Sequence, residues 1–184
     1  MLSCRFSVGY FDYIDDMMIN TVKESLWRQF GASIDMLKNA IALWPEEKWN
    51  TDKRFYYNAY HCLFFLDYYL TIPHTNFSAQ LPFTIGESPD AIDDIIPDRI
   101  YSKKELLDYL QSSREKCRQI IAGLTEEKME ERWIEEGGDR NYAVLELLLY
   151  NMRHVQHHAA QLNMLLRNAI NNAPRWVSHA KDDL

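Results

Sequence analysis

The sequence predicts an all-α protein that folds as a four-helix bundle. Apolar residues recur at steps of three and four in four separate segments, which is the spacing of one face of an α-helix. No segment shows a convincing strand pattern. The connections between the first and second segments and between the third and fourth are short, whereas the middle one is long. This order describes a four-helix bundle with a long crossover between helices 2 and 3.

The first two helices are predicted over residues 21–43 and about 52–71. Trp44-Pro45 ends the first helix, because the residue before a proline is pushed out of the helical region. The second helix is rich in aromatic residues, and Pro73 closes it. The apolar stripe of the first helix consists of Val22, Leu26, Phe30, Ile34, Leu37 and Ile41.

Residues 73–100 are predicted to form the long crossover, with at most one short helical turn. They contain several prolines and show no sustained periodicity. A loop of this length in a compact domain is unusual and often functional. It either covers the functional site or is a solvated loop, and we favour the second interpretation. Its polar residues of interest are His74, Asp90, Asp93 and Asp94.

The third helix is predicted over about residues 103–123. Ser102 and Glu105 have the spacing of a capping box, in which each side chain binds the backbone amide of the other residue. Gly123 is a typical helix end. The residues that this helix should bury are Leu106, Leu107, Leu110, Cys117, Ile120 and Ile121.

A short turn at residues 125–128 and a break at the two glycines of residues 137–138 lead to the fourth helix. This helix is predicted over residues 141–169, which makes it about 40 Å long at the usual rise per residue. All four helices are expected in a single domain, residues 1–184, with a C-terminal tail over about 171–184.

Composition excludes several classes of partner. The 184 residues carry 20 basic and 27 acidic side chains, a net charge of −7, which argues against a protein that binds nucleic acid by neutralising phosphates. The longest uncharged run, residues 68–86, is interrupted by prolines, so no membrane span is expected. Cys4, Cys62 and Cys117 are odd in number and far apart, which favours free thiols in a reducing compartment. We therefore expect a cytoplasmic protein.

Polar residues interrupt the apolar stripe of the last helix near its middle. Asn151, His154 and His158 follow one another on a face otherwise made of leucine and valine. The second helix has the same feature, because His61 lies midway along a face of aromatic residues. The full stripe of the last helix is Leu147, Leu148, Asn151, His154, Val155, His158, Leu162 and Leu165, and the face in the second helix is Tyr57, His61, Phe64, Phe65 and Tyr68.

These histidines are candidates for a metal site. A single buried histidine is more often a hydrogen-bonded core residue than a metal ligand. Three histidines near the middle of their helices are harder to explain as hydrogen-bonded core residues. His154 and His158 are four residues apart, so both rings project from one helix face, and His61 joins them if the two helices are neighbours. Neutral imidazole is a common ligand, and three rings on one side of an ion leave the other side open.

Two other metal patterns do not fit. A zinc-protease helix needs a glutamate directly after its first histidine, and Val155 stands there after His154. A di-iron bundle needs Glu-x-x-His pairs, and no glutamate stands three residues before any histidine.

The histidine segments resemble those of the DinB-like superfamily, four-helix bundle proteins of the DinB/YfiT-like type with a three-histidine metal site. The similarity rests on residues 57–61 (Tyr-Asn-Ala-Tyr-His) and residues 151–161, and residues 43–49 (Leu-Trp-Pro-Glu-Glu-Lys-Trp) are similar to the link after the family's first helix. Many relatives have Gly-Gln two and three positions after the last ligand, where this chain has Ala160 and Gln161.

The resemblance implies that His61, His154 and His158 hold one divalent ion, with His157 a neighbour that points away from the seam. Imidazole suits Zn, Ni, Cu and Fe alike, and the expected ion is Ni, Zn, Fe or Mn. The residues that would orient the rings or contact substrate are Tyr57, Asn58, Asn151 and His157.

Three functions are compatible with such a site. Some members of the family are metal-dependent transferases that use a low-molecular-weight thiol, and a few are mycothiol-dependent isomerases. Transfer of a thiol cosubstrate to an electrophilic small molecule is therefore the first hypothesis, and metal-dependent hydrolysis is the second. Cys62 points about 100° away from His61 around the helix, so it is expected in the core and not as the nucleophile.

The third hypothesis is a non-catalytic dimeric bundle that binds a metal or ligand. It draws on apolar residues outside the helix stripes, which would dock on the bundle or form a homodimer contact. These residues are Phe6, Tyr10, Phe11, Tyr13, Met17, Met18 and Trp176.

Overall fold

The computed structural model describes residues 8–86 and 95–184, and within these ranges the chain is mostly helical. Four helices are long: α1 (Val8–Leu43), α2 (Lys53–Tyr69), α3 (Lys103–Ala122) and α5 (Val144–Ile170). The shorter elements are α4 (Glu126–Glu130), the 3-10 helices η1 (Glu46–Lys48) and η2 (His74–Asn76), and the strands β1 (Phe83–Ile85), β2 (Ile95–Pro97), β3 (Arg132–Ile134) and β4 (Asn141–Ala143).

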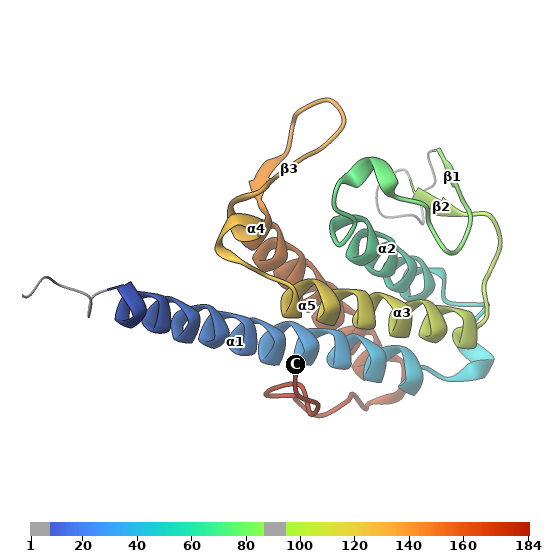
Figure 1. The fold of residues 1–184 in the computed structure, drawn as a ribbon. Helices are drawn as coiled ribbons and strands as arrows, with labels where there is room; N and C mark the ends of the chain where they lie inside the picture. Colours follow the sequence, from blue (N-terminus) through green and yellow to red (C-terminus); the bar gives the residue numbers. More distant parts are fainter. Residues whose placement is uncertain (1–7, 87–94) are drawn as a thin grey trace, which may run out of the picture.

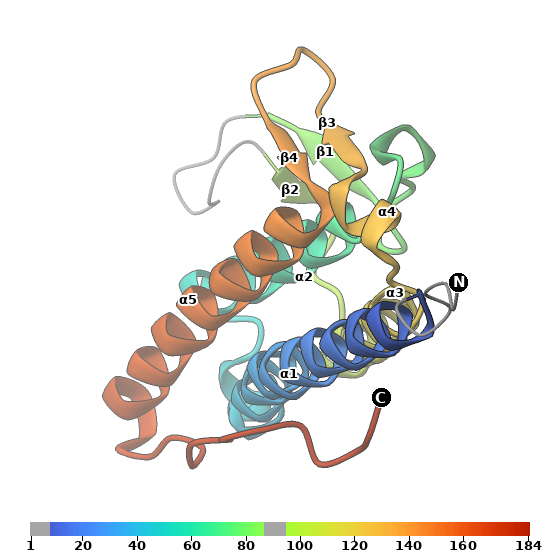
Figure 2. The same ribbon diagram turned by 60° about the vertical axis from the view of Figure 1, so that its left-hand side comes forward.

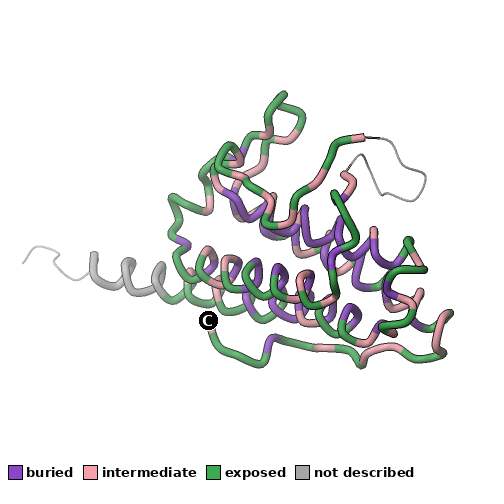
Figure 3. The backbone as a smooth tube through the Cα atoms, turned by 90° about the vertical axis from the view of Figure 1, so that its right-hand side faces the viewer, coloured by how far each residue is buried: buried purple, intermediate pink, exposed green. Residues whose placement is uncertain are grey.

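The long helices enclose the core between them (Figure 1). Helix α1 packs against α3 and α5, and α2 packs against the same two helices. Buried positions therefore face inward along all four helices, as Figure 3 shows. The predicted stripe of α1 is confirmed from Leu26 onward, and Trp44, just past the end of α1, stacks on Phe55 of α2 with ring centroids 3.9 Å apart.

Helix α1 begins at Val8, not near residue 21 as predicted. The prediction followed the buried stripe, and that stripe stops where α1 extends beyond the other helices (Figure 1). Met17 and Met18 are 54% and 61% exposed, so the buried stripe does not include these two positions. The helix continues because no proline interrupts it and each added residue gains a backbone hydrogen bond. The side chains of Phe6, Tyr10, Phe11 and Tyr13 lie outside the described part.

The expectation that the chain has no strand is wrong. Strands β1 and β2 form an antiparallel hairpin inside the predicted crossover, and β3 and β4 form a second one. Each strand has three residues, which is too short for alternation to be visible in the sequence. Both hairpins lie at the same end of the molecule (Figure 2). Asp90, Asp93 and Asp94 fall outside the described residues.

The second hairpin also corrects the start of the last helix. Residues 141–143 pair with β3, so α5 begins at Val144 and not at residue 141. The predicted break at residues 137–138 is the turn of this hairpin. Gly137 and Gly138 have φ of 98° and 80°, a conformation that favours glycine.

Helix α3 has the predicted limits and capping box. The Ser102 hydroxyl accepts a hydrogen bond from the Glu105 amide (3.2 Å), and the Glu105 carboxylate accepts one from the Ser102 amide (2.8 Å). Of the residues predicted in its core, Leu107 and Ile120 are half-buried and the rest are buried.

The C-terminal tail, residues 171–184, is irregular and runs along α1 (Figure 2). The Ala180 amide donates to the Arg28 carbonyl (2.9 Å), and the Trp27 indole donates to the Asp182 carbonyl (2.9 Å). Arg114 of α3 binds Asp182 as well, so the tail is attached to two helices.

Among the helices of residues 8–86 and 95–184, none is both long and apolar enough to cross a lipid bilayer.

Candidate metal centre

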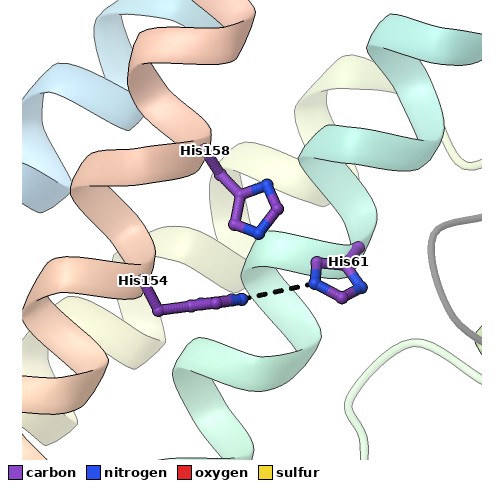
Figure 4. A group of neighbouring side chains, drawn as sticks. All are labelled: His61, His154 and His158. Carbon is purple, nitrogen blue, oxygen red and sulfur yellow. Dashed lines mark hydrogen bonds between the residues drawn. The ribbon is translucent and has the colours of Figure 1, made fainter.

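Three imidazole rings meet between α2 and α5. His61 lies midway along α2, and His154 and His158 project from one face of α5 toward it (Figure 4). One ring nitrogen from each histidine lies within 4.8 Å of the other two. The convergence that the sequence predicted only for neighbouring helices is therefore present.

The spacing of the ring nitrogens suits a metal ion. The Nε2 atoms of His61 and His154 are 3.3 Å apart. Two nitrogens bound to one tetrahedral zinc ion at about 2.0–2.1 Å lie about 3.3 Å from each other. Without an ion, one of these nitrogens must carry a proton, and this proton makes the hydrogen bond drawn in Figure 4. Two of the rings therefore have the spacing that one ion requires, and the nitrogen of the third ring lies within 4.8 Å of both.

Burial keeps two of the rings neutral. It lowers the pKa of His154 to about 3, with His158 and His61 adding smaller effects of the same sign. Burial also lowers the pKa of His158 to about 4, with smaller contributions from His61 and His157. At neutral pH both rings therefore have an unprotonated nitrogen, which is the form that binds metal.

His158 has an outer partner that fixes its ring. Its Nδ1 is 3.0 Å from the Oδ1 of Asn58 in α2. An amide oxygen only accepts hydrogen bonds, so Nδ1 carries the proton and Nε2 is left with its lone pair. This is the arrangement of a metal-ligating histidine with a second hydrogen-bonding partner.

His154 is held by packing instead. Its Nδ1 is buried and has no hydrogen-bond partner. The ring lies in a group of aromatic side chains, with centroids 5.9 Å from Phe65 and 6.1 Å from Tyr69, and 4.4 Å from the ring of His158. Phe65 also packs 4.7 Å from His61, so one side chain of α2 touches two of the three rings.

The other predicted site residues have different surroundings. Asn151 is fully buried and donates to the Leu66 carbonyl (3.0 Å), so it joins α5 to α2, while its Oδ1 has no partner. Tyr57 is half-buried and meets Tyr56 edge to face at 5.6 Å. His157 is exposed, in agreement with a ring that points away from the seam.

Sequence reasoning missed two groups near the rings. Gln161 bonds to both Asn58 and His157, at 2.9 Å in each case. Arg140 of the second hairpin forms an ion pair with Glu135 (2.7 Å), and its positive charge contributes to the lowered pKa of His154. Gln161 stands three residues after His158, where many relatives also have a glutamine, whereas Arg140 belongs to a hairpin that was not predicted.

The ligand group is electrically neutral. Within the described residues, no carboxylate or thiol joins the three histidines. Cys62 and Cys117 are fully buried, and burial raises the pKa of both thiols. The expectation that Cys62 belongs to the core is confirmed.

Fold and site together define a mostly helical protein whose histidine cluster is compatible with a metal ion. The family model of the DinB superfamily matches residues 24–162, and the chain belongs to that superfamily. The match includes all three histidines and ends before the C-terminal tail. Neither the curated proteins nor the solved structures give a match.

Proposed function

We propose that the chain is a metal-dependent enzyme that transfers a low-molecular-weight thiol to an electrophilic small molecule. His61, His154 and His158 hold the ion in this proposal. The observation that carries it is the meeting of three ring nitrogens within 4.8 Å, on helices that the superfamily match covers.

A divalent ion held by these rings supplies positive charge that stabilises the anionic form of a thiol. The chain's own residues bind the ion, keep it between α2 and α5 and surround it with aromatic rings. In this proposal the thiol comes from a cosubstrate, because the two cysteines among the described residues, Cys62 and Cys117, are buried with raised pKa values. In the transfer, the thiolate sulfur bonds to an electrophilic carbon, the leaving group departs with its electron pair, and the thiol proton goes to solvent.

Thiol transfer is favoured over hydrolysis by the composition of the site. Hydrolysis by a bound water is helped by a general base. In the described part of the chain, the cluster contains no carboxylate that would serve as one. A non-catalytic bundle would have the same rings, so only turnover separates it from an enzyme.

The proposal extends to the fold, the oligomeric state and the location of the protein. We propose that α1, α2, α3 and α5, which pack against one another, form the four-helix bundle of the superfamily as a single domain over residues 1–184. A homodimer is proposed because apolar side chains such as Met17, Met18 and Trp176 are exposed. A cytoplasmic location is proposed from the free thiols of Cys62 and Cys117.

The test measures metal content first and turnover second. Purified protein should contain about one equivalent of Ni, Zn, Fe or Mn by elemental analysis, and His158→Ala should lose it. His179→Ala is the matched control, because His179 lies exposed in the C-terminal tail. The metallated protein is then incubated with a panel of thiols and a chromogenic electrophile. A rate equal to that of His158→Ala would refute the enzymatic proposal.

A further inference from the structure

A pocket of about 470 Å³ lies between α1 and the C-terminal tail, which Figure 2 shows running along that helix. The residues that line it are Asp35, Lys38 and Asn39 of α1, and residues 175–179 and Lys181 of the tail. None of them belongs to the histidine cluster, and the tail lies beyond the residues that the superfamily model matches. The pocket is therefore a feature of this chain that is separate from the proposed metal site.

Three cationic side chains of the pocket have no counter-ion. Lys38, Arg175 and Lys181 are exposed, and none of them forms an ion pair with another residue in the described part of the chain. The carboxylate of the lining, Asp35, is bound by Arg114 of α3 instead, at 2.9 Å. A chain with a net charge of −7 thus gathers unpaired positive charge in one pocket, and such a pocket favours an anionic ligand.

The same pocket contains an exposed indole. Trp176 is 70% exposed, whereas the other four tryptophans of the chain are buried in the core, at most 3% exposed: Trp27, Trp44, Trp49 and Trp133. An exposed indole offers a flat face on which a planar ring stacks, and nucleobases stack on aromatic side chains in this way. The pocket therefore combines a stacking surface with positive charge.

Hydrogen bonds to α1 fix the tail before any ligand binds. The Ala180 amide donates to the Arg28 carbonyl at 2.9 Å, and the Gln29 side chain donates to the Ser178 carbonyl at 3.3 Å. Both tail residues lie between Trp176 and Lys181 in the sequence. A site whose wall is already in place loses less conformational freedom on binding than one that must be ordered by its ligand.

We propose that this pocket binds a nucleotide, a small molecule in which phosphate is joined to a planar base. Lys38, Arg175 and Lys181 bind the phosphate, since guanidinium and ammonium groups are its usual partners. The base stacks on Trp176, and the Asn39 carboxamide offers a donor and an acceptor for polar groups of the base or sugar. Cations alone would suit inorganic phosphate and an indole alone a neutral ring, so their presence in one pocket favours a ligand with both parts. The volume lies in the usual range for small-molecule sites, about 300–1,000 Å³.

The test titrates ADP, adenosine and inorganic phosphate separately into the full chain and measures binding by calorimetry. ADP should bind at least about 5-fold more tightly than either of the other two, because each of them lacks one half of the proposed contacts. Added salt should weaken the binding of ADP, because it screens the exposed cations. ADP should also quench the emission of Trp176, excited where adenine does not absorb, and Trp176→Leu should abolish this quenching.

Substitutions in the pocket should weaken ADP binding by different routes. Trp176→Leu should raise the dissociation constant at least about 5-fold through loss of stacking. Lys38→Gln/Arg175→Gln should raise it by about 5-fold through loss of two exposed charge contacts. The matched control is Arg54→Gln/Lys104→Gln, which removes the same charge from two exposed residues that do not line the pocket and should bind ADP like wild type.

Four results would overturn the proposal. Absence of saturable ADP binding at about 1 mM would exclude a nucleotide site of useful affinity. Equal affinity for ADP and inorganic phosphate would show an anion site in which no base stacks. Equal weakening in the pocket variant Lys38→Gln/Arg175→Gln and in its control would mean that only the overall charge matters. A wild-type dimer that becomes monomeric in Trp176→Leu, with no quenching by ADP, would place the indole between two copies instead. The metal site is independent of all four, and His158→Ala should still bind ADP.

Discussion

Acid should destabilise the metal-free protein through two buried imidazoles. In the folded chain, burial lowers the pKa of His154 to about 3 and that of His158 to about 4, whereas an unfolded histidine titrates near about 6.5. Above pH 6.5 both rings are neutral in both states and add no pH dependence. As the pH falls below this value, the unfolded chain takes up protons that the folded chain does not, so the free energy of unfolding decreases.

The size of the effect follows from these pKa values. Each ring contributes a slope of at most about 1.4 kcal/mol per pH unit between the unfolded and folded pKa. Between pH 7.5 and pH 5, His154 and His158 together should therefore remove about 4 kcal/mol of stability. A small domain is stable by roughly 5–15 kcal/mol, so a loss of this size brings the protein close to unfolding.

Urea unfolding in the presence of a chelator measures this loss at pH 7.5, 6.5 and 5. The double variant His154→Gln/His158→Gln removes both titrating rings and should show a much flatter dependence. His179→Gln, in the exposed tail, serves as the control and should behave like wild type. An equal loss of stability in wild type and in the double variant would refute the reasoning, because it would mean that the rings are not held neutral in the folded chain.

Two further predictions concern the packing around the core. A Cβ at Gly31 would lie 2.7 Å from the Cβ of Ala180, so Gly31→Ala should displace the C-terminal tail and speed its cleavage in limited proteolysis. The free energy of unfolding should change little, because alanine gains about 1 kcal/mol of helix propensity over glycine. An unchanged cleavage rate would contradict this. Lys116→Met should lower the free energy of unfolding by about 2–3 kcal/mol, because Asp67 is buried and would keep only the hydrogen bond from Tyr109. The double variant Lys116→Met/Asp67→Asn should recover part of this free energy of unfolding. If it recovered none, the unpaired charge of Asp67 would not be the cause of the loss.

Helical periodicity in the sequence identifies the four long helices because each must bury one face. A helix that packs on a core shows this period in its sequence, and a helix segment without such packing does not. Met17 and Met18 of α1 are exposed, so the buried stripe does not include them, and the strands are too short to alternate. Each hairpin forms by pairing of two segments, and neither segment alone has a recognisable strand pattern. The position of Arg140 could therefore not be derived from its neighbours in the sequence.

The candidate site was visible from the sequence for a different reason. A histidine on an apolar stripe stands out against its neighbours, so His61, His154 and His158 could be named before their distances were known. The contacts of Gln161 could not be derived from the sequence, because they depend on which side chain of α2 faces it. That partner, Asn58, is fixed by the register of α2 against α5, and the periodicity of each helix alone does not determine this register.

The neutrality of the cluster also bears on the choice between thiol and water as the reacting group. Three neutral rings leave the charge of a divalent ion uncompensated. Such a site favours an anion, and it does so strongly in a buried environment of low dielectric constant. A thiol ionises near about pH 8.5, whereas water ionises near about 15.7, so far less stabilisation is needed to make a thiolate than a hydroxide. Thiol transfer should therefore be faster than hydrolysis of the same electrophile at neutral pH, and a hydrolysis rate equal to or above the thiol-transfer rate would contradict this order.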